Sequence, residues 1–158
     1  MKTEDLKELL YQSWELLSHS TETLNQSLNR CKQIDLESVV ISTEDSDALD
    51  ALTSKFARCS DIFTQKVLNT VLLLKRVTAP TFVDKMNNCE KIGIISHANE
   101  MIEIRDLRNE ISHEYWMDNL RKQQKFSIKI IPSLFKNIDL TKEYLINESL
   151  LDNQKLPK

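Results

Sequence analysis

Residues that interrupt helices are almost absent from this chain of 158 residues, which contains one glycine and three prolines. Glycine and proline are the least favourable residues in a helix interior and the most common ones in tight turns. A chain with so few of them is expected to be nearly all helix. Its length fits a single domain, residues 1–158, whose core is large enough to need no disulfide or metal.

The spacing of apolar residues predicts where the helices lie. The expected helices cover about residues 4–33, 47–77, 81–92 and 97–116, and a fifth helix follows that Pro132 either kinks or splits. An acidic linker, about residues 34–46, separates the first two helices and offers Ser42, Thr43 and Ser46 as N-caps. Gly93 is expected to end the third helix. These elements predict an all-α bundle of four to five helices, largely antiparallel.

The charge distribution gives only weak information about partners. A formal net charge of -3 argues against a protein that coats DNA, because such proteins neutralise many phosphates with Lys and Arg. Six acids and no base lie between residues 34 and 54, whereas basic residues gather after residue 120. Arg121, Lys125 and Lys129 share one helical stripe, which is either a surface for RNA contacts or an ordinary solvated face.

Neither a metal nor a membrane is expected. Cys31, Cys59 and Cys89 are odd in number and lack metal-ligand spacing, as do the histidines, so we expect reduced thiols and no cofactor. The first residues are acidic where a signal peptide needs bases, and no apolar run approaches the roughly 20 residues of a membrane span. The sequence therefore predicts a cytoplasmic protein.

The strongest chemical signal is the segment at residues 108–115, which reads Arg-Asn-Glu-Ile-Ser-His-Glu-Tyr. An arginine holds phosphate through paired hydrogen bonds, a histidine moves protons near neutral pH, and a tyrosine hydroxyl accepts a nucleotidyl group. These three side chains supply what metal-free phosphodiester chemistry needs. The segment is thus the first place to look for an active site.

On a helix, Arg108 and Tyr115 border the core-facing side, and Asn109 and Ser112 fall within the same broad polar strip. His113 lies about 140° from Arg108, so the two do not touch along a straight helix. They are expected to line two walls of one cleft that another helix or a second subunit completes. Asp61, on the long second helix, is expected to orient Arg108.

The order arginine, asparagine, three residues, histidine, one residue, tyrosine resembles the signature of HEPN-domain proteins. The resemblance is to HepT-type toxins, which pair with MntA-type nucleotidyltransferase antitoxins. Surrounding segments look similar to the same family over about residues 50–150: Phe56-Ala57-Arg58 with Asp61, Asp84-Lys85-Met86 with Glu90-Lys91-Ile92-Gly93, and Arg105-Asp106-Leu107.

The resemblance implies a helical domain that forms a homodimer through its motif helices and cleaves RNA, with tRNA as the first candidate, without a metal. Arg108 and His113 match the family's catalytic pair, and Asn109 matches the polar residue that shapes the site. Tyr115 matches the tyrosine to which the partner nucleotidyltransferase transfers AMP, which silences the toxin. The expected products are a 2′,3′-cyclic phosphate and a 5′-hydroxyl.

Structural roles compete with each of these assignments. His113 is also suited to interact with free carbonyls at a helix end, Arg108 to form an ion pair with Asp61, and Tyr115 to pack with Trp116 as an aromatic plug. Two other functions therefore stay open. One is a noncatalytic subunit that binds a minimal nucleotidyltransferase and its substrate, and the other is a helical adaptor.

Overall fold

The computed structural model describes residues 2–113 and 117–156 and, over those residues, is all-α with no strand. The elements are α1 (Thr3–Cys31), α2 (Thr43–Asp61), η1 (Ile62–Leu68), α3 (Asn69–Leu74), α4 (Phe82–Ile92), α5 (Ala98–His113), α6 (Met117–Asn147) and η2 (Asn153–Lys155). α2, η1 and α3 follow one another without a break and form one long helix. Five helices are thus packed together.

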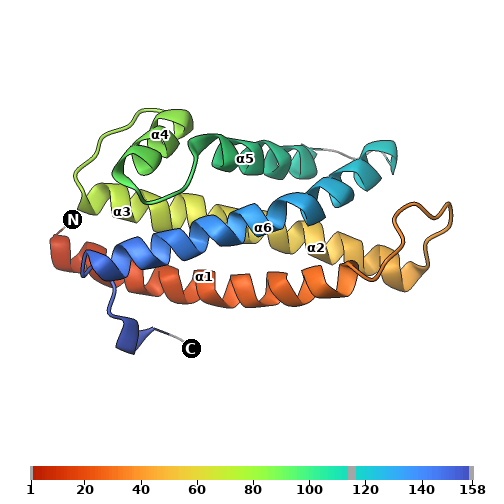
Figure 1. The fold of residues 1–158 in the computed structure, drawn as a ribbon, viewed down its shortest axis with the longest axis horizontal. Coiled ribbons are helices and arrows are strands. Elements are labelled where there is room, and N and C mark those ends of the chain that lie inside the picture. Colours follow the sequence, from red (N-terminus) through yellow and green to blue (C-terminus); the bar gives the residue numbers. More distant parts are fainter. Residues whose placement is uncertain (1, 114–116, 157–158) are drawn as a thin grey trace.

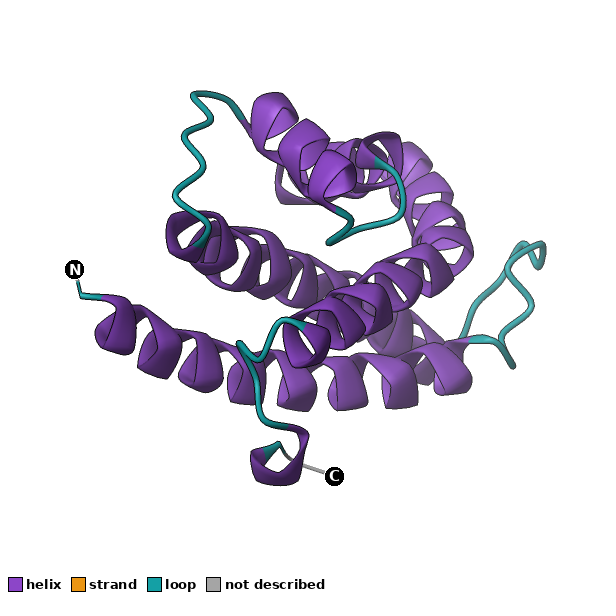
Figure 2. Ribbon diagram, turned by 60° about the vertical axis from the view of Figure 1, so that its left-hand side comes forward, coloured by secondary structure: helices purple, strands orange, loops and turns teal. Residues whose placement is uncertain are grey.

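The long helices lie roughly along the long axis of the molecule (Figure 1). α1 and the α2–η1–α3 helix run in opposite directions and pack along each other, joined by the loop at residues 32–42. α5 and α6 also run in opposite directions, and α6 packs against both α5 and α2. The shorter α4 packs beside α5 (Figure 2). No helix in the described part of the chain is long and apolar enough to cross a membrane.

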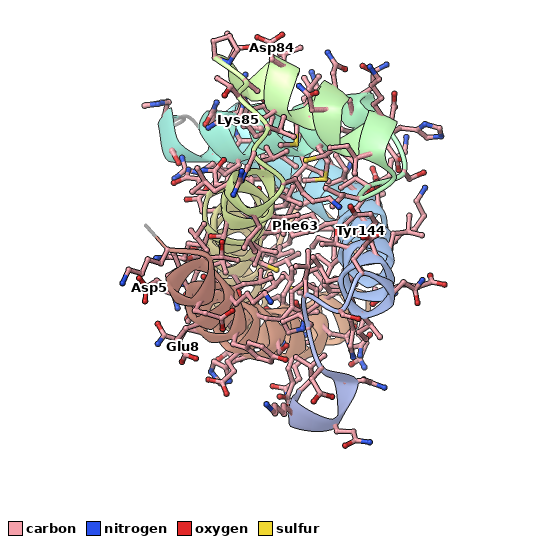
Figure 3. The ribbon with its side chains drawn as sticks, turned by 90° about the vertical axis from the view of Figure 1, so that its left-hand side faces the viewer. Asp5, Glu8, Phe63, Asp84, Lys85 and Tyr144 are labelled. Carbon is pink, nitrogen blue, oxygen red and sulfur yellow. The ribbon has the colours of Figure 1, made fainter. Side chains whose placement is uncertain are left out.

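Buried apolar side chains from all five helices form one cluster. Phe56 and Phe63, on the long middle helix, are fully buried at its centre. Figure 3 shows Phe63 enclosed between the helices, whereas Asp5 on α1 and Asp84 on α4 lie at the outer edge. Burial of this surface is the main force that holds the helices together, because apolar area removed from water stabilises by about 25 cal/mol per Å².

The long middle helix contains a π-helical segment, η1, which begins directly after Asp61. Its wider turns still bury Ile62, Phe63, Val67 and Leu68. π-Helical turns are uncommon and occur often at functional sites. The apolar spacing predicted one helix over about residues 47–77 but gave no sign of this segment.

Local residue chemistry sets several helix ends. The Ser42 hydroxyl accepts the Asp45 N–H at 3.1 Å and caps α2, so the linker ends at Ser42 and the predicted boundary at residue 46 was too late. The Thr81 hydroxyl caps α4 in the same way. Gly93 ends α4 with a left-handed φ of 92°, which confirms its predicted role.

Buried polar contacts fix the start of α5, which carries the motif. Asn137 of α6 accepts the Ser96 N–H at 2.8 Å, and Thr141 donates its hydroxyl to the Ile94 carbonyl at 2.9 Å. The first N–H of α5, at Ala98, donates to the Glu90 carboxylate at 3.0 Å. Because α4 and α6 both hold the loop before α5, the register of the motif helix is set from its first turn.

α6 runs without a break through Pro132. Proline lacks the N–H that would bond to the carbonyl four residues earlier, which usually weakens a helix at that point. Here Ile131 and Leu134 on either side of it are fully buried. Of the two alternatives expected for Pro132, a kink or a split, the split is thus excluded, because packing on both sides keeps the helix together.

Candidate functional site

Arg108 and Asp61 form a bidentate ion pair between α5 and the end of α2. Nε of Arg108 donates to Oδ1 of Asp61 at 2.7 Å, and Nη2 donates to Oδ2 at 2.7 Å. Nη1 donates to the Ser112 hydroxyl at 2.7 Å, one turn further along α5. The contact expected between Asp61 and Arg108 is thus present, and Ser112 completes it.

A groove of about 530 Å³ opens beside this pair, between α5 and the α2–η1 helix. We call it the arginine groove; its lining is Ala57, Arg58, Asp61, Ile62, Gln65, Lys66 and Arg108. Arg108 and Asp61 are partly buried, with 28% and 31% of their side-chain surface exposed. The hydrogen bonds that Arg108 donates to the Asp61 carboxylate raise the pKa of Arg108, against a smaller opposing effect of burial. The guanidinium is therefore a fixed cation in a place that solvent reaches.

His113 does not lie in the arginine groove. It is the last residue of α5, it is exposed, and its ring has no hydrogen-bond or ion-pair partner among the described residues. Asn109 is exposed as well. The described part of one chain does not bring Arg108 and His113 into one groove, so another helix of the same chain does not complete the expected cleft. Completion of that cleft by a second subunit stays a prediction. Tyr115 and Trp116 lie outside the described residues.

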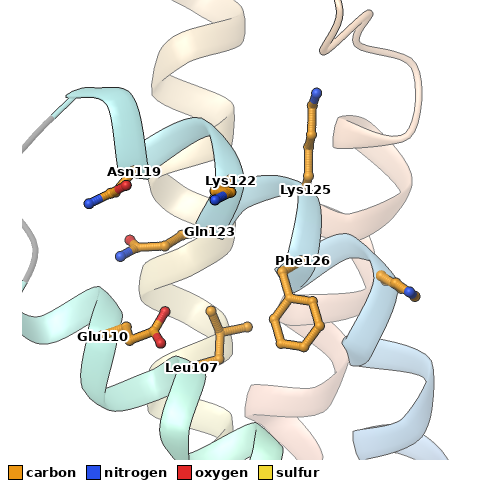
Figure 4. Close-up of a pocket in the computed structure, with 8 residues that line it drawn as sticks. Leu107, Glu110, Asn119, Lys122, Gln123, Lys125 and Phe126 are labelled. Carbon is orange, nitrogen blue, oxygen red and sulfur yellow. The ribbon is translucent and has the colours of Figure 1, made fainter.

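A second groove, of about 760 Å³, lies on the other side of α5, between α5 and α6 (Figure 4). We call it the lysine groove. Leu107 and Glu110 form its α5 wall. Its α6 wall consists of Asn119, Lys122, Gln123, Lys125, Phe126 and Lys129.

The predicted basic stripe on α6 is partly occupied by the acidic loop at residues 32–42. Arg121 donates to the Leu36 carbonyl at 3.1 Å, and the Lys125 ammonium lies 2.6 Å from the Glu37 carboxylate. Lys129 keeps its place on the wall of the lysine groove. Of the three residues predicted to contact RNA, Arg121 and Lys125 are therefore already bound to another part of the chain.

The three thiols, Cys31, Cys59 and Cys89, are free and buried. Burial raises the pKa of Cys31 and Cys59, and it raises that of Cys89 to about 12. Among the described residues, no group of three His, Cys, Asp or Glu side chains is placed to hold a metal ion.

Sequence reasoning missed two residues of the lysine groove, Gln123 and Phe126. Gln123 is 5% exposed, and Phe126, at 38%, is one of the few large apolar side chains that remain open to solvent. An aromatic residue inside the lysine-rich segment was the available signal, because aromatic and basic residues together favour nucleic-acid contacts. The arginine groove, in contrast, contains the two residues that were predicted to meet.

Comparisons with protein families, with curated proteins and with solved structures gave no match to this chain.

Proposed function

We propose that this chain is a metal-independent endoribonuclease of the HEPN type that acts in the cytoplasm as the toxin of a toxin–antitoxin pair. The observation that carries the proposal is the Arg108–Asp61 pair, which holds a cation at the edge of an open groove five residues before an exposed histidine. Phosphodiester cleavage needs a fixed cation and a group that moves protons.

The separation of Arg108 from His113 favours a composite site built by two copies. In a homodimer whose α5 helices meet, the His113 side chains of both copies approach one scissile phosphate. One imidazole takes the proton of the ribose 2′-hydroxyl, whose oxygen attacks phosphorus. The bond to the 5′-oxygen breaks, and the second imidazole, as imidazolium, protonates that oxygen. Arg108 stabilises the negative charge that develops on the phosphorane. The products carry a 2′,3′-cyclic phosphate and a 5′-hydroxyl.

The proposed antitoxin is an MntA-like nucleotidyltransferase that modifies Tyr115. The phenol oxygen attacks the α-phosphorus of ATP, an AMP ester forms, and pyrophosphate leaves. Tyr115 follows His113 by two residues, so an AMP group there adds bulk and negative charge near the histidine. Repulsion between this group and the substrate phosphate accounts for the loss of toxicity.

The test incubates the purified protein with total RNA and with tRNA in the presence of a chelator. The parallel samples contain His113→Ala, Arg108→Ala and the control His19→Ala, which removes another exposed histidine from α1. We expect the parent and His19→Ala to leave 2′,3′-cyclic ends and the other two variants to leave RNA intact. Cleavage by His113→Ala at the parental rate would remove the basis of the proposal.

A second function is favoured by the two hydrogen bonds that commit much of the Arg108 guanidinium to Asp61, since a paired arginine attracts phosphate less strongly. Under this alternative the chain is a noncatalytic subunit that binds a nucleotidyltransferase. RNA then stays intact in every sample, while the nucleotidyltransferase and labelled ATP still modify the parent and fail to modify Tyr115→Phe.

A further inference from the structure

The amide of Gln123 lines the lysine groove and is open to a ligand there. Gln123 is 5% exposed, yet its side chain has no hydrogen-bond partner among the described residues. Figure 4 shows its amide end directed toward the α5 wall, between Asn119 and Glu110. Among the described residues, the buried side-chain atom without a hydrogen-bond partner is Arg105 Nε, so the amide of Gln123 is reached by solvent in the groove. The free donor and acceptor of Gln123 therefore suit a ligand in this groove.

An aromatic ring lines the same groove. Phe126 is 38% exposed, and in Figure 4 its ring lies beside Leu107 at the open side of the groove. An exposed aromatic face offers a stacking surface to a flat ring, and such stacking is the usual way in which proteins hold single-stranded bases. The exposed Phe126 ring therefore has a direct use in a binding site.

Two lysines flank Phe126 on α6. Lys122 lies four residues before it and Lys129 three residues after it, so all three share one side of the helix. The two lysines are about 10 Å apart along the helix axis. Neither forms an ion pair with a described acid, whereas Lys125 is bound to Glu37. An aromatic ring between two available cations matches a base with a phosphate on each side.

The α5 wall has the opposite charge. Glu110 lines the groove across from the lysines, and a carboxylate accepts hydrogen bonds from ribose hydroxyls or from amino groups of a base. The volume of about 760 Å³ lies within the range of small-molecule sites, about 300–1,000 Å³. The groove thus provides separate places for phosphate, base and sugar.

We propose that the lysine groove binds one nucleotide of a single-stranded RNA, with its base on Phe126 and against the Gln123 amide and its flanking phosphates on Lys122 and Lys129. This inference rests on the proposed ribonuclease function and names the place where the substrate strand is held. Glu110 lies three residues before His113 on α5, so a strand in the groove continues past the catalytic end of that helix.

The test measures binding without cleavage. A fluorescent 2′-O-methyl RNA hexamer lacks the attacking hydroxyl, so its anisotropy reports affinity for the full chain at low and at moderate salt. Phe126→Ala is expected to weaken binding about 5- to 100-fold, because it removes the stacking of one base. Lys122→Ala and Lys129→Ala are each expected to weaken binding and to lower the slope of log affinity against log salt by about 1.

Matched controls on α6 are Leu140→Ala, which also shortens an exposed apolar side chain, and Lys142→Ala, which removes a lysine far from the groove. Both are expected to bind as the parent does. Gln123→Met keeps the volume but removes the amide, and we expect weaker binding with an unchanged or higher melting temperature. Weaker binding without a loss of stability would show that Gln123 contacts the ligand and is not needed for folding.

The inference is overturned if Phe126→Ala binds the hexamer as tightly as the parent does. It is also overturned if poly-glutamate, added at the same concentration of negative charge as the RNA, displaces the hexamer from the parent. The second result would mean that the groove accepts any acidic chain. Failure of the ribonuclease proposal gives a different result, in which RNA is not cleaved but the hexamer binds and Phe126→Ala weakens it. His113→Ala is expected to lose cleavage and to keep binding.

Discussion

Arg108 and Asp61 lie 47 residues apart in the sequence and meet through two parallel hydrogen bonds of 2.7 Å each. A guanidinium has five N–H groups, and here two bind Asp61 and one binds Ser112. Two N–H groups are left for a phosphate oxygen. The pair thus fixes the direction of Arg108 and connects α5 to the helix just before η1.

Removing Asp61 is expected to lower the free energy of unfolding by about 1–2 kcal/mol, since hydrogen bonds to charged groups contribute about 1.5–3 kcal/mol and this pair is partly exposed. Urea denaturation of Asp61→Ala, Arg108→Ala and the double variant forms a thermodynamic cycle. We expect the double variant to lose clearly less than the sum of the single losses. Simple additivity would mean that the pair contributes nothing. Glu103→Ala, an exposed acid on α5, is the control.

Gly93→Ala is expected to destabilise the protein by about 1–2 kcal/mol, because alanine does not favour the left-handed conformation. A Cβ at this position meets no atom within 4 Å, so the backbone conformation alone causes the loss. Thermal melting should fall by a few degrees. Gly93→Asn is the informative comparison, since asparagine tolerates this region better and should lose less. Equal melting temperatures for the parent, Gly93→Ala and Gly93→Asn would mean that the left-handed backbone at residue 93 does not limit stability.

Local chemistry explains why much of the fold was predictable. Apolar residues at helical spacing determine which residues enter the core, and Ser42, Thr81 and Gly93 act on neighbouring backbone groups only. The contact of Arg108 with Asp61 was also predictable, because a cation at the border of the core-facing side of one helix needs an acid on a neighbouring helix, and Asp61 lies on the long middle helix. Each of these features can be predicted from the sequence of a single helix, or of two helices that pack against each other.

The missed features depend on contacts between distant segments. The Ser96 N–H binds Asn137, 41 residues later, and Arg121 binds the Leu36 carbonyl, 85 residues earlier. No periodic pattern indicates which loop meets which helix. The groove around Gln123 has the same origin, since residues of α5 and of α6 together form its walls. The apolar spacing does not encode the π segment either.

Glu37→Gln is expected to strengthen binding of the 2′-O-methyl RNA hexamer without changing stability. The Glu37–Lys125 pair is largely exposed on the glutamate side, 82%, and exposed pairs contribute little to folding. Without that carboxylate, Lys125 becomes available to phosphate and one negative charge leaves the neighbourhood of the groove. Anisotropy at low salt should show tighter binding, and the gain should fade as salt rises. Weaker binding would mean that the loop itself contacts RNA.

The three thiols are expected to be inert in the folded protein. Cys31, Cys59 and Cys89 are all buried, and burial raises their pKa, to about 12 for Cys89, so little thiolate exists at neutral pH. Dithionitrobenzoate should label none of them quickly in native buffer and all three in denaturant. Fast labelling of the native chain would show that a helix opens locally, and mapping the labelled cysteine would identify that helix.

Glu100 is expected to make stability depend on acid pH. Burial opposes ionisation of this carboxyl, but the Ser133 hydroxyl at 2.6 Å and the Lys136 ammonium at 3.1 Å outweigh it, so the pKa of Glu100 is lowered from 4.5. A carboxyl with a lowered pKa in the folded state stabilises the fold above its unfolded pKa, and this stabilisation is lost as pH falls through the folded pKa.

The measurement is the free energy of unfolding of the parent and of Glu100→Gln between pH 7 and pH 3. Glutamine keeps the size and a hydrogen-bond acceptor but has no charge to lose. We expect the variant to be less stable at pH 7 and the difference to shrink below about pH 4.5, where the unfolded parent begins to bind a proton at Glu100 before the folded parent does. Glu103→Gln, on the exposed face of α5, should show no such convergence. A constant difference between parent and Glu100→Gln at all pH values would mean that hydrogen-bond geometry, and not the charge of Glu100, joins α5 to α6.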